Sequence, residues 1–274
     1  MLKRIISAAI GIVFILAVIF FSASVPIIVD IFVALVCAVA VGEFANATNT
    51  LKLVQISVPS IVFAFLYPML LNYDMETIIW YIYTAIMLSM MIFNYKKITF
   101  IEFAYTYSMS NIITFSLSTV IMMKDMNVTH SAFYFILALA LPWLADAGAY
   151  FTGTFFGKHK LCPEISPKKT IEGAIGGTVF GVLCTCLTGF IFSEWIYGNG
   201  VSINYINLIL LAFFGSLLSI LGDLSFSLVK RTFKIKDYGS IIPGHGGVLD
   251  RFDSVIFVSP FLWIMIKYMP VLIT

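Results

Sequence analysis

Acidic, hydroxyl and basic side chains gather at the end of an apolar run, between residues 223 and 231. Asp223 and Ser227 are four residues apart. The basic pair Lys230-Arg231 follows one helical turn later, which places the whole set on one face of a helix. Carboxylate and hydroxyl oxygens suit Mg²⁺, and nearby cations suit phosphate oxygens. The alternative interpretation is an Asp–Lys ion pair within the helix.

The next polar segment, residues 236–253, reads KDYGSIIPGHGGVLDRFD. The glycines around His245 would let backbone N–H groups form a nest that binds an anion. Asp250 and Asp253 would lie at the start of a final helix, where a carboxylate also stabilises the helix amino terminus. Two carboxylates beside Asp223 are more typical of ligands to a divalent cation. We therefore predict a metal site formed by Asp223, Asp250 and Asp253.

Asp146 is an acidic residue within an apolar segment, on the same helix face as Tyr150 and Gly153. An aspartate within a membrane helix is costly unless it faces a polar interior or a partner. The alternative is a hydrogen bond between packed helices, along a seam of small residues that includes Gly148. We favour a functional role for Asp146.

A basic loop follows Asp146, and residues 156–177 read FGKHKLCPEISPKKTIEGAIGG. Ser166 can begin a turn, and Thr170 can cap the helix that follows. Helix amino termini bind phosphate through free N–H groups and the helix dipole, and Lys168 and Lys169 add positive charge. The glycines at the end of the segment would permit close approach of backbone or ligand. We predict a phosphate-binding loop, with contact to anionic lipid headgroups as the alternative.

These segments combine acidic metal ligands, basic side chains and glycine-rich loops. Such a combination is typical of phosphoryl or nucleotidyl transfer, in which catalysis is mainly positioning and neutralisation of charge.

The elements that must position these residues are membrane helices. Hydrophobic residues make up 61% of the 274-residue chain and charged residues 11%, with a mean hydropathy of +1.02. A soluble domain of this length could not bury so much apolar surface in one core, and a helix crosses the hydrocarbon with about 20 apolar residues. We predict an all-α, polytopic integral membrane protein with about nine transmembrane helices, over residues 5–21, 25–45, 53–71, 77–93, 99–123, 130–156, 171–193, 204–230 and 252–272.

Basic residues indicate the orientation of these helices, because Lys and Arg favour cytoplasmic loops. With the amino terminus inside, all 16 basic residues except Lys124 and Lys267 fall in inner connections. The amino terminus and the predicted site then face the cytoplasm, and we expect a bacterial plasma membrane. Glu43 and Glu102, near helix ends, are interpreted as interfacial. The first apolar run could instead be a cleaved signal peptide, but its length favours a retained helix.

The uneven distribution of polar clusters predicts two parts of the chain. Residues 1–125 are expected to form a transmembrane scaffold. Residues 126–274 are expected to form a catalytic region, with cytoplasmic loops at 157–171 and 231–251. The four cysteines fall in membrane or cytoplasmic positions and predict no disulfide framework. The net charge of +2 gives no indication of nucleic-acid binding.

The segment from Ser227 to Asp253 resembles the signature of a known family. It contains S-x-V-K-R, then K-D-x-G, then I-P-x-H-G-G and finally D-R-F-D, with no departure across 27 positions. This pattern resembles that of phosphatidate cytidylyltransferases, also called CDP-diacylglycerol synthases. The loop that begins at Ser166, the pair Trp143 and Asp146, and the polytopic layout are also similar to that family.

The resemblance implies conversion of CTP and phosphatidate to CDP-diacylglycerol and pyrophosphate, with Mg²⁺ held at Asp223 and Asp250. Nothing in the residue spacing itself specifies cytidine. Membrane lipids are expected partners, nucleic acid is not, and a homodimer is a further expectation. The residues expected to act in catalysis are Asp223, Asp250, Lys230, Arg231, His245 and Asp253. The residues expected to bind substrate are Ser166, Lys168, Lys169, Ser227, Lys236, Asp237, Gly246, Gly247, Arg251 and Asp146.

Three other functions remain open from the residues alone. A membrane lipid or polyprenol kinase would use the same equipment but release a nucleoside diphosphate instead of pyrophosphate. An ion-coupled transporter would use Asp146 and Asp223 as intramembrane ion sites, and would place charges near mid-helix rather than at one membrane face. A membrane interaction protein would tolerate alanine throughout the polar cluster.

Overall fold

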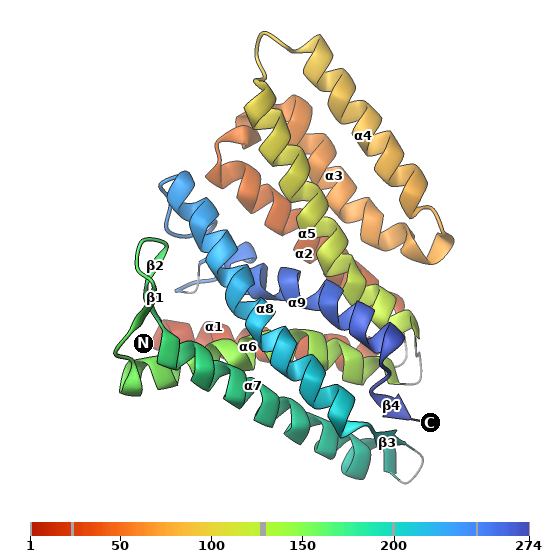
Figure 1. Ribbon diagram of the computed structural model, residues 1–274. Coiled ribbons are helices and arrows are strands. Elements are labelled where there is room, and N and C mark those ends of the chain that lie inside the picture. Colours follow the sequence, from red (N-terminus) through yellow and green to blue (C-terminus); the bar gives the residue numbers. More distant parts are fainter. Residues whose placement is uncertain (1, 23–24, 127–129, 199–200, 245, 274) are drawn as a thin grey trace. The chain divides into compact units, whose positions relative to one another are not determined.

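The computed structural model describes residues 2–22, 25–126, 130–198, 201–244 and 246–273 (Figure 1). Helices dominate this part of the chain. The α-helices are α1 (Leu2–Ser22), α2 (Ile27–Ala47), α3 (Val54–Leu70), α4 (Glu76–Phe93), α5 (Phe100–Met126), α6 (Ser131–Phe156), α7 (Ile171–Ile191), α8 (Tyr205–Thr232) and α9 (Leu249–Tyr268). The shorter helical segments are η1 (Thr50–Lys52), η2 (Leu71–Tyr73) and the π-helix η4 (Phe192–Tyr197).

Each predicted transmembrane segment corresponds to one α-helix, with ends that differ by a few residues. Within the described residues, six helices are long and apolar enough to cross a membrane, namely α2, α3 with η2, α4, α6, α7 with η4, and α8. The prediction of an all-α, polytopic fold is confirmed, and the protein is an integral membrane protein.

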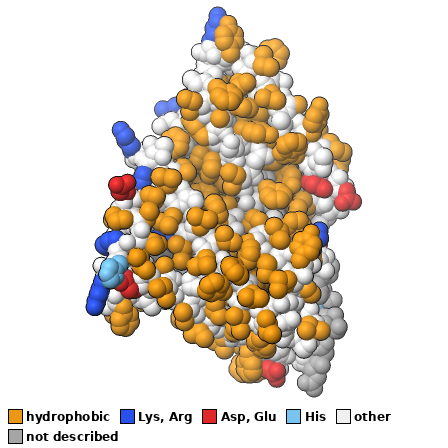
Figure 2. Space-filling view, viewed as in Figure 1, with side chains coloured by type: hydrophobic (Ala, Val, Ile, Leu, Met, Phe, Trp, Pro, Cys, Tyr) orange, Lys and Arg blue, Asp and Glu red, His pale blue; other side chains and the backbone are white. Residues whose placement is uncertain are grey.

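Hydrophobic side chains cover most of the molecular face shown in Figure 2. Large aromatic residues such as Phe93, Phe155 and Trp195 are among the most exposed. An apolar surface of this extent marks an interaction site on a soluble protein, whereas in lipid it is the surface that helices normally present.

The chain forms two compact units, of which the first comprises Met1–Met122 and Thr232–Phe252. Within it, α1 packs against α2, α2 against α3, and α3 against α4. The α3–α4 contact contains a short polar chain, in which the Tyr83 hydroxyl lies 2.9 Å from the Ser60 hydroxyl and 2.6 Å from that of Ser110 on α5. These bonds give hydrogen-bond partners to the Tyr83 hydroxyl, which is buried between the helices. The first unit is thus a helical scaffold to which the polar segment 232–252 belongs.

The second unit comprises Met123–Arg231 and Asp253–Thr274. Its main contact is a tight seam between α6 and α7. A Cβ atom added to Gly177 would lie 2.6 Å from the Ala145 carbonyl oxygen and 2.7 Å from the Ala149 Cβ atom. Small residues let two helix backbones approach closely in a membrane. At Gly177, the close approach predicted from the sequence is therefore that of the backbone of α6.

The loop between α6 and α7 contains a β-hairpin that the sequence analysis treated as irregular. Strands β1 (Lys160–Cys162) and β2 (Ser166–Thr170) pair antiparallel and extend beyond the ends of α6 and α7 (Figure 1). The Gly173 backbone N–H donates to the Thr170 hydroxyl at 3.1 Å, so Thr170 caps α7 as predicted. A second short pair joins β3 (Ser202–Ile203) to β4 (Leu272–Ile273).

Candidate functional site

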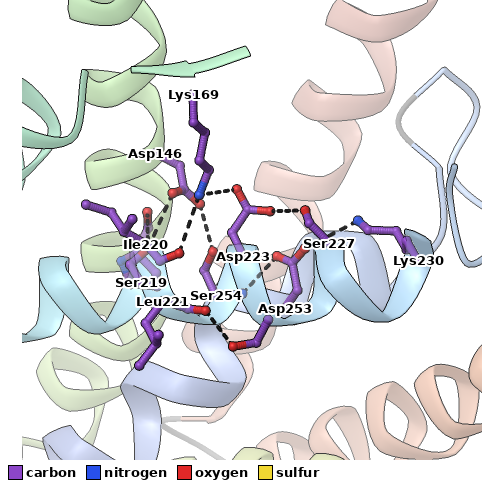
Figure 3. Close-up of polar contacts among 12 residues, drawn as sticks. Asp146, Lys169, Ser219, Ile220, Leu221, Asp223, Ser227, Lys230, Asp253 and Ser254 are labelled. Carbon is purple, nitrogen blue, oxygen red and sulfur yellow. Dashed lines mark hydrogen bonds and ion pairs between the residues drawn. The ribbon is translucent and has the colours of Figure 1, made fainter. Parts of the chain in front are cut away.

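Asp223 on α8 contacts a lysine of the β-hairpin (Figure 3). Its Oδ2 atom lies 2.6 Å from the Nζ atom of Lys169. Its Oδ1 atom accepts a hydrogen bond of 3.3 Å from the Ser227 hydroxyl, one turn along the same helix. Lys169 also donates to the Ile220 carbonyl oxygen at 3.5 Å. Two segments that the sequence analysis considered separately, the α8 face and the basic loop, therefore meet at Asp223.

Asp253, in the first turns of α9, is a second carboxylate of this region. It is buried, with 6% of its surface exposed. Its Oδ1 atom accepts a 2.8 Å hydrogen bond from the Ser254 backbone N–H, and its Oδ2 atom lies 3.8 Å from the Nζ atom of Lys230 on α8. A buried charge is costly without a partner, so the ion pair with Lys230 helps to keep this carboxylate within the helices.

Asp146 on α6 completes the group. Its Oδ1 atom accepts a 3.4 Å hydrogen bond from the Ser219 hydroxyl of α8, and its Oδ2 atom accepts one of 3.0 Å from the Ser254 hydroxyl of α9. Asp146 thus has partners on two other helices, as both of its sequence-based interpretations required. We call the set Asp146, Lys169, Asp223, Lys230 and Asp253 the aspartate–lysine cluster.

The aspartate–lysine cluster has a formal charge of −1, because three carboxylates (−3) face two ammonium groups (+2). The charge of Asp223 acts on both Asp146 and Asp253. Like charges repel strongly where water is scarce, and the lysines relieve that repulsion, as a bound cation would. The cluster is therefore suited to a cation that arrives together with a phosphate-bearing substrate.

The donor atoms of the cluster fit Mg²⁺, which binds oxygen ligands. The carboxylates of Asp223 and Asp253 and the Ser227 hydroxyl are hard oxygen donors within one unit. Across the described part of the chain, no three His, Cys, Asp or Glu side chains form a ready-made metal cage. Mg²⁺ does not need one, since it usually takes one or two carboxylates and completes its shell with substrate phosphates and water.

Arg231, at the end of α8, is bound to the hairpin. Its Nε atom donates a 3.2 Å hydrogen bond to the carbonyl oxygen of Ile165. The neighbouring hairpin residues Ser166, Lys168 and Lys169 differ in exposure: Lys168 is exposed, whereas Ser166 and Lys169 are partly buried. Of the two adjacent lysines, Lys169 is the one that contacts the Asp223 carboxylate, and Arg231 holds the strand pair beside α8.

Asp250 lies in the first unit, in a cradle of backbone N–H groups. Its Oδ2 atom accepts hydrogen bonds from the Tyr238 N–H at 2.8 Å and from the Gly247 N–H at 3.0 Å. Gly246 has a φ angle of +87°, a conformation that side chains disfavour. The loop therefore forms an anion-binding arrangement of the predicted kind, and a carboxylate of the protein itself contacts its N–H groups.

Glu43 on α2 is the residue that the sequence analysis missed. It was interpreted as interfacial, but it is 6% exposed and its Oε2 atom accepts a 2.8 Å hydrogen bond from the Leu249 backbone N–H. Cβ atoms added to Gly239 or Gly247 would collide with its carboxylate. The available signal was the cost of a glutamate inside an apolar span, which makes such a residue functional by default. Because Glu43 lies near the end of its helix, it was interpreted as interfacial instead.

The remaining predicted residues of segment 232–252 lie at its surface or outside the description. Lys236, Asp237 and Arg251 are exposed. His245 lies outside the described residues. Asp250 belongs to the first unit and Asp223 and Asp253 to the second, so their joint metal site stays a prediction.

Comparison with known proteins identifies related chains. Residues 2–269 match the model of the cytidylyltransferase family. The phosphatidate cytidylyltransferase of Bacillus subtilis is 44% identical over 133 residues, which cover 48% of this chain and 47% of the relative. The phosphatidate cytidylyltransferase of Staphylococcus haemolyticus is 45% identical over 136 residues, 50% of each chain. The chain thus spans about half the length of the curated relatives it matches. The family match covers nearly the whole chain, and the protein belongs to the cytidylyltransferase family.

Proposed function

We propose that this protein transfers the cytidylyl group of CTP to phosphatidate, giving CDP-diacylglycerol and pyrophosphate. The observation that carries the proposal is the aspartate–lysine cluster, in which carboxylates and ammonium groups from α6, α8, α9 and the hairpin converge. Membership of the cytidylyltransferase family and the names of the relatives support the identity of both substrates.

In this reaction an oxygen of the phosphatidate phosphate attacks the α-phosphorus of CTP. A new phosphorus–oxygen bond forms, and the bond from the α-phosphorus to the bridging oxygen of the β-phosphate breaks, so pyrophosphate leaves with the bonding electron pair. A largely deprotonated phosphate monoester is already a competent nucleophile. The chain therefore has mainly to position two anions and to offset their charge.

The roles of the residues follow from their charges. Lys169 and Lys230 already face carboxylates at 2.6 Å and 3.8 Å, and they would bind phosphate oxygens once the carboxylates engage a cation. Asp223, Asp250 and Asp253 are the proposed ligands of Mg²⁺, which when bound supplies positive charge to the triphosphate. Ser227 orients Asp223 through its hydrogen bond. His245 is proposed to position a phosphate.

The place of the reaction is also a proposal. The distribution of basic residues favours an amino terminus and a substrate site at the cytoplasmic face, where CTP is available. The apolar surface of the helices supports a lipid substrate that enters from the membrane. Association of two copies remains a prediction from the sequence.

The test is a product assay on the purified protein in lipid nanodiscs that contain phosphatidate. With CTP and Mg²⁺, we expect equal amounts of pyrophosphate and radiolabelled CDP-diacylglycerol, and we expect neither product when phosphatidate is omitted. Release of a nucleoside diphosphate would identify a lipid kinase instead. Uptake of an ion or solute without any lipid product would identify a transporter.

A further inference from the structure

Glu43 has an unusual environment for a carboxylate in an apolar helix. Its Oε2 atom accepts the Leu249 N–H, the first backbone donor of α9. Its Oε1 atom is buried and has no hydrogen-bond partner among the residues that the structure describes. Leaving one oxygen of a buried carboxylate without a partner costs free energy, so the position requires an explanation beyond packing.

Two glycines of residues 236–250, which we call the glycine-rich segment, lie beside the Glu43 carboxylate. A Cβ atom at Gly247 would lie 2.6 Å from the carboxyl carbon of Glu43, and one at Gly239 would also collide with this group. Because Gly239 and Gly247 have no side chains, their backbone can approach this carboxylate closely. The contacts with Gly239, Gly247 and Leu249 therefore indicate that Glu43 holds the segment in place.

The same segment ends at Asp250, which also contacts Gly247. The Gly247 N–H donates to Asp250, while the Cα atom of Gly247 faces Glu43. The ring centroid of Phe44, next to Glu43, lies 6.4 Å from that of Phe233, which precedes the segment, and 6.2 Å from that of Tyr238, near the start of the segment. Glu43 and Phe44 thus contact the segment near its end and its beginning.

We infer that Glu43 is a positioning residue, which fixes segment 236–250 and through it the carboxylate of Asp250. The Glu43 carboxylate also accepts a hydrogen bond at the amino terminus of α9, where backbone N–H groups point outward. The inference rests on the proposed function, in which Asp250 binds the cation. It assigns to the amino-terminal helices, expected from the sequence to be scaffold, a direct influence on the site.

The first experiment compares two exchanges of a buried carboxylate for an amide on the same helix. Glu43→Gln replaces the carboxyl group beside Gly239 and Gly247 with an amide. Asp30→Asn is the matched control, because Asp30 is also buried in α2 but contacts Asn72. We expect Glu43→Gln to lower kcat about tenfold with little change in the KM for CTP, and to raise the Mg²⁺ concentration needed for half-maximal rate. Asp30→Asn should leave these parameters unchanged.

The second experiment is a double-mutant cycle that uses the contact with Gly239, whose φ angle is not positive. Gly239→Ala alone adds a methyl group that collides with the Glu43 carboxylate, and we expect a loss of about tenfold in activity. In the Glu43→Ala background the space is free, so Gly239→Ala should have little further effect. Independent, multiplicative losses would overturn the inference.

A readout without catalysis separates this inference from the proposed function. Hydrogen exchange in the segment 239–249 should become faster in Glu43→Ala and stay unchanged in Asp30→Asn. If wild type makes no CDP-diacylglycerol but this difference is seen, the proposed reaction fails and the positioning role stands. Unchanged exchange in folded Glu43→Ala, with activity equal to wild type, would refute the positioning role.

Discussion

The two polar regions hold their carboxylates in different ways. In the aspartate–lysine cluster, Asp223 and Asp253 face lysine side chains, and Asp253 also accepts a hydrogen bond from a backbone N–H, that of Ser254. In the glycine-rich segment, Asp250 and Glu43 accept hydrogen bonds from the backbone N–H groups of Tyr238, Gly247 and Leu249. A lysine has four flexible side-chain bonds and can leave its partner, whereas a backbone donor is fixed by its loop.

The charged groups of the aspartate–lysine cluster can therefore rearrange, whereas the carboxylates of the glycine-rich segment are fixed in position. Lysines that face carboxylates can turn to phosphates when a substrate and its cation arrive. A carboxylate held by backbone donors keeps its position before and after binding, which is what preorganisation of a site requires. We therefore expect lysine variants of the cluster to change substrate affinity and charge dependence, and variants of the segment to change turnover.

The largest effect should come from removing the central carboxylate. Asp223→Asn is expected to lower turnover by about 100-fold or more, because several kcal/mol of charge stabilisation depend on the metal. The control is Asp125→Asn, whose carboxylate pairs with Lys124 at 3.5 Å. Initial rates of pyrophosphate release at saturating CTP and phosphatidate check this. Near-native turnover in Asp223→Asn would contradict the assignment of Asp223 as a metal ligand. It would also contradict the distinction between the aspartate–lysine cluster and the glycine-rich segment.

The adjacent lysines of β2 test whether contact with the cluster matters more than charge alone. Lys169→Met is expected to lower kcat/KM for CTP about tenfold, since a charge-assisted hydrogen bond is worth about 1.5–3 kcal/mol. Lys168→Met removes the same charge from an exposed position, and its smaller effect should diminish at high salt. Equal losses at all salt concentrations would show that the loop acts only through its net charge.

The seam between α6 and α7 should respond as packing rather than as chemistry. Gly177→Ala forces a methyl group against the Ala145 carbonyl oxygen and is expected to destabilise the protein by about 1–3 kcal/mol. Gly11→Ala is the control, because a Cβ atom there meets nothing within 4 Å. Thermal unfolding in detergent measures both. An unchanged melting temperature in Gly177→Ala would argue against the tight seam.

The smallest effect should distinguish two serines of α8. Ser227 donates to the Asp223 carboxylate, and Ser225 donates to the Leu221 carbonyl oxygen at 2.8 Å. Ser227→Ala is expected to lower kcat/KM by a few-fold, in line with about 0.5–1.5 kcal/mol for one hydrogen bond. Ser225→Ala should match wild type in the same assay. If both variants behave alike, orientation of Asp223 by Ser227 has no catalytic weight.

Local patterns in the sequence predicted much of this structure. Apolar runs long enough to cross a membrane predicted the helices, and the spacing of Asp223 and Ser227 predicted that both lie on one face of a helix. The capping role of Thr170 was also predicted, because a cap depends on neighbours within one turn.

Contacts between distant segments could not be predicted in this way. The Lys169–Asp223 pair joins residues from a hairpin and a helix, and no periodicity relates them. The hairpin itself was missed, since charged and proline-containing segments favour loops over strands. Glu43 was misinterpreted for a similar reason. A glutamate near a helix end resembles an interfacial residue, and its partner Leu249 lies 206 residues further along the chain.

The glycine contacts between α6 and α7 also bear on the response of this protein to its lipid environment. Because the two backbones touch without long side chains between them, the helices have little freedom to slide or to separate when the bilayer becomes thinner or thicker. The distance from Asp146 on α6 to the hairpin at the start of α7 should then stay constant across membranes of different acyl-chain length. Turnover measured in nanodiscs of different thickness should accordingly vary little.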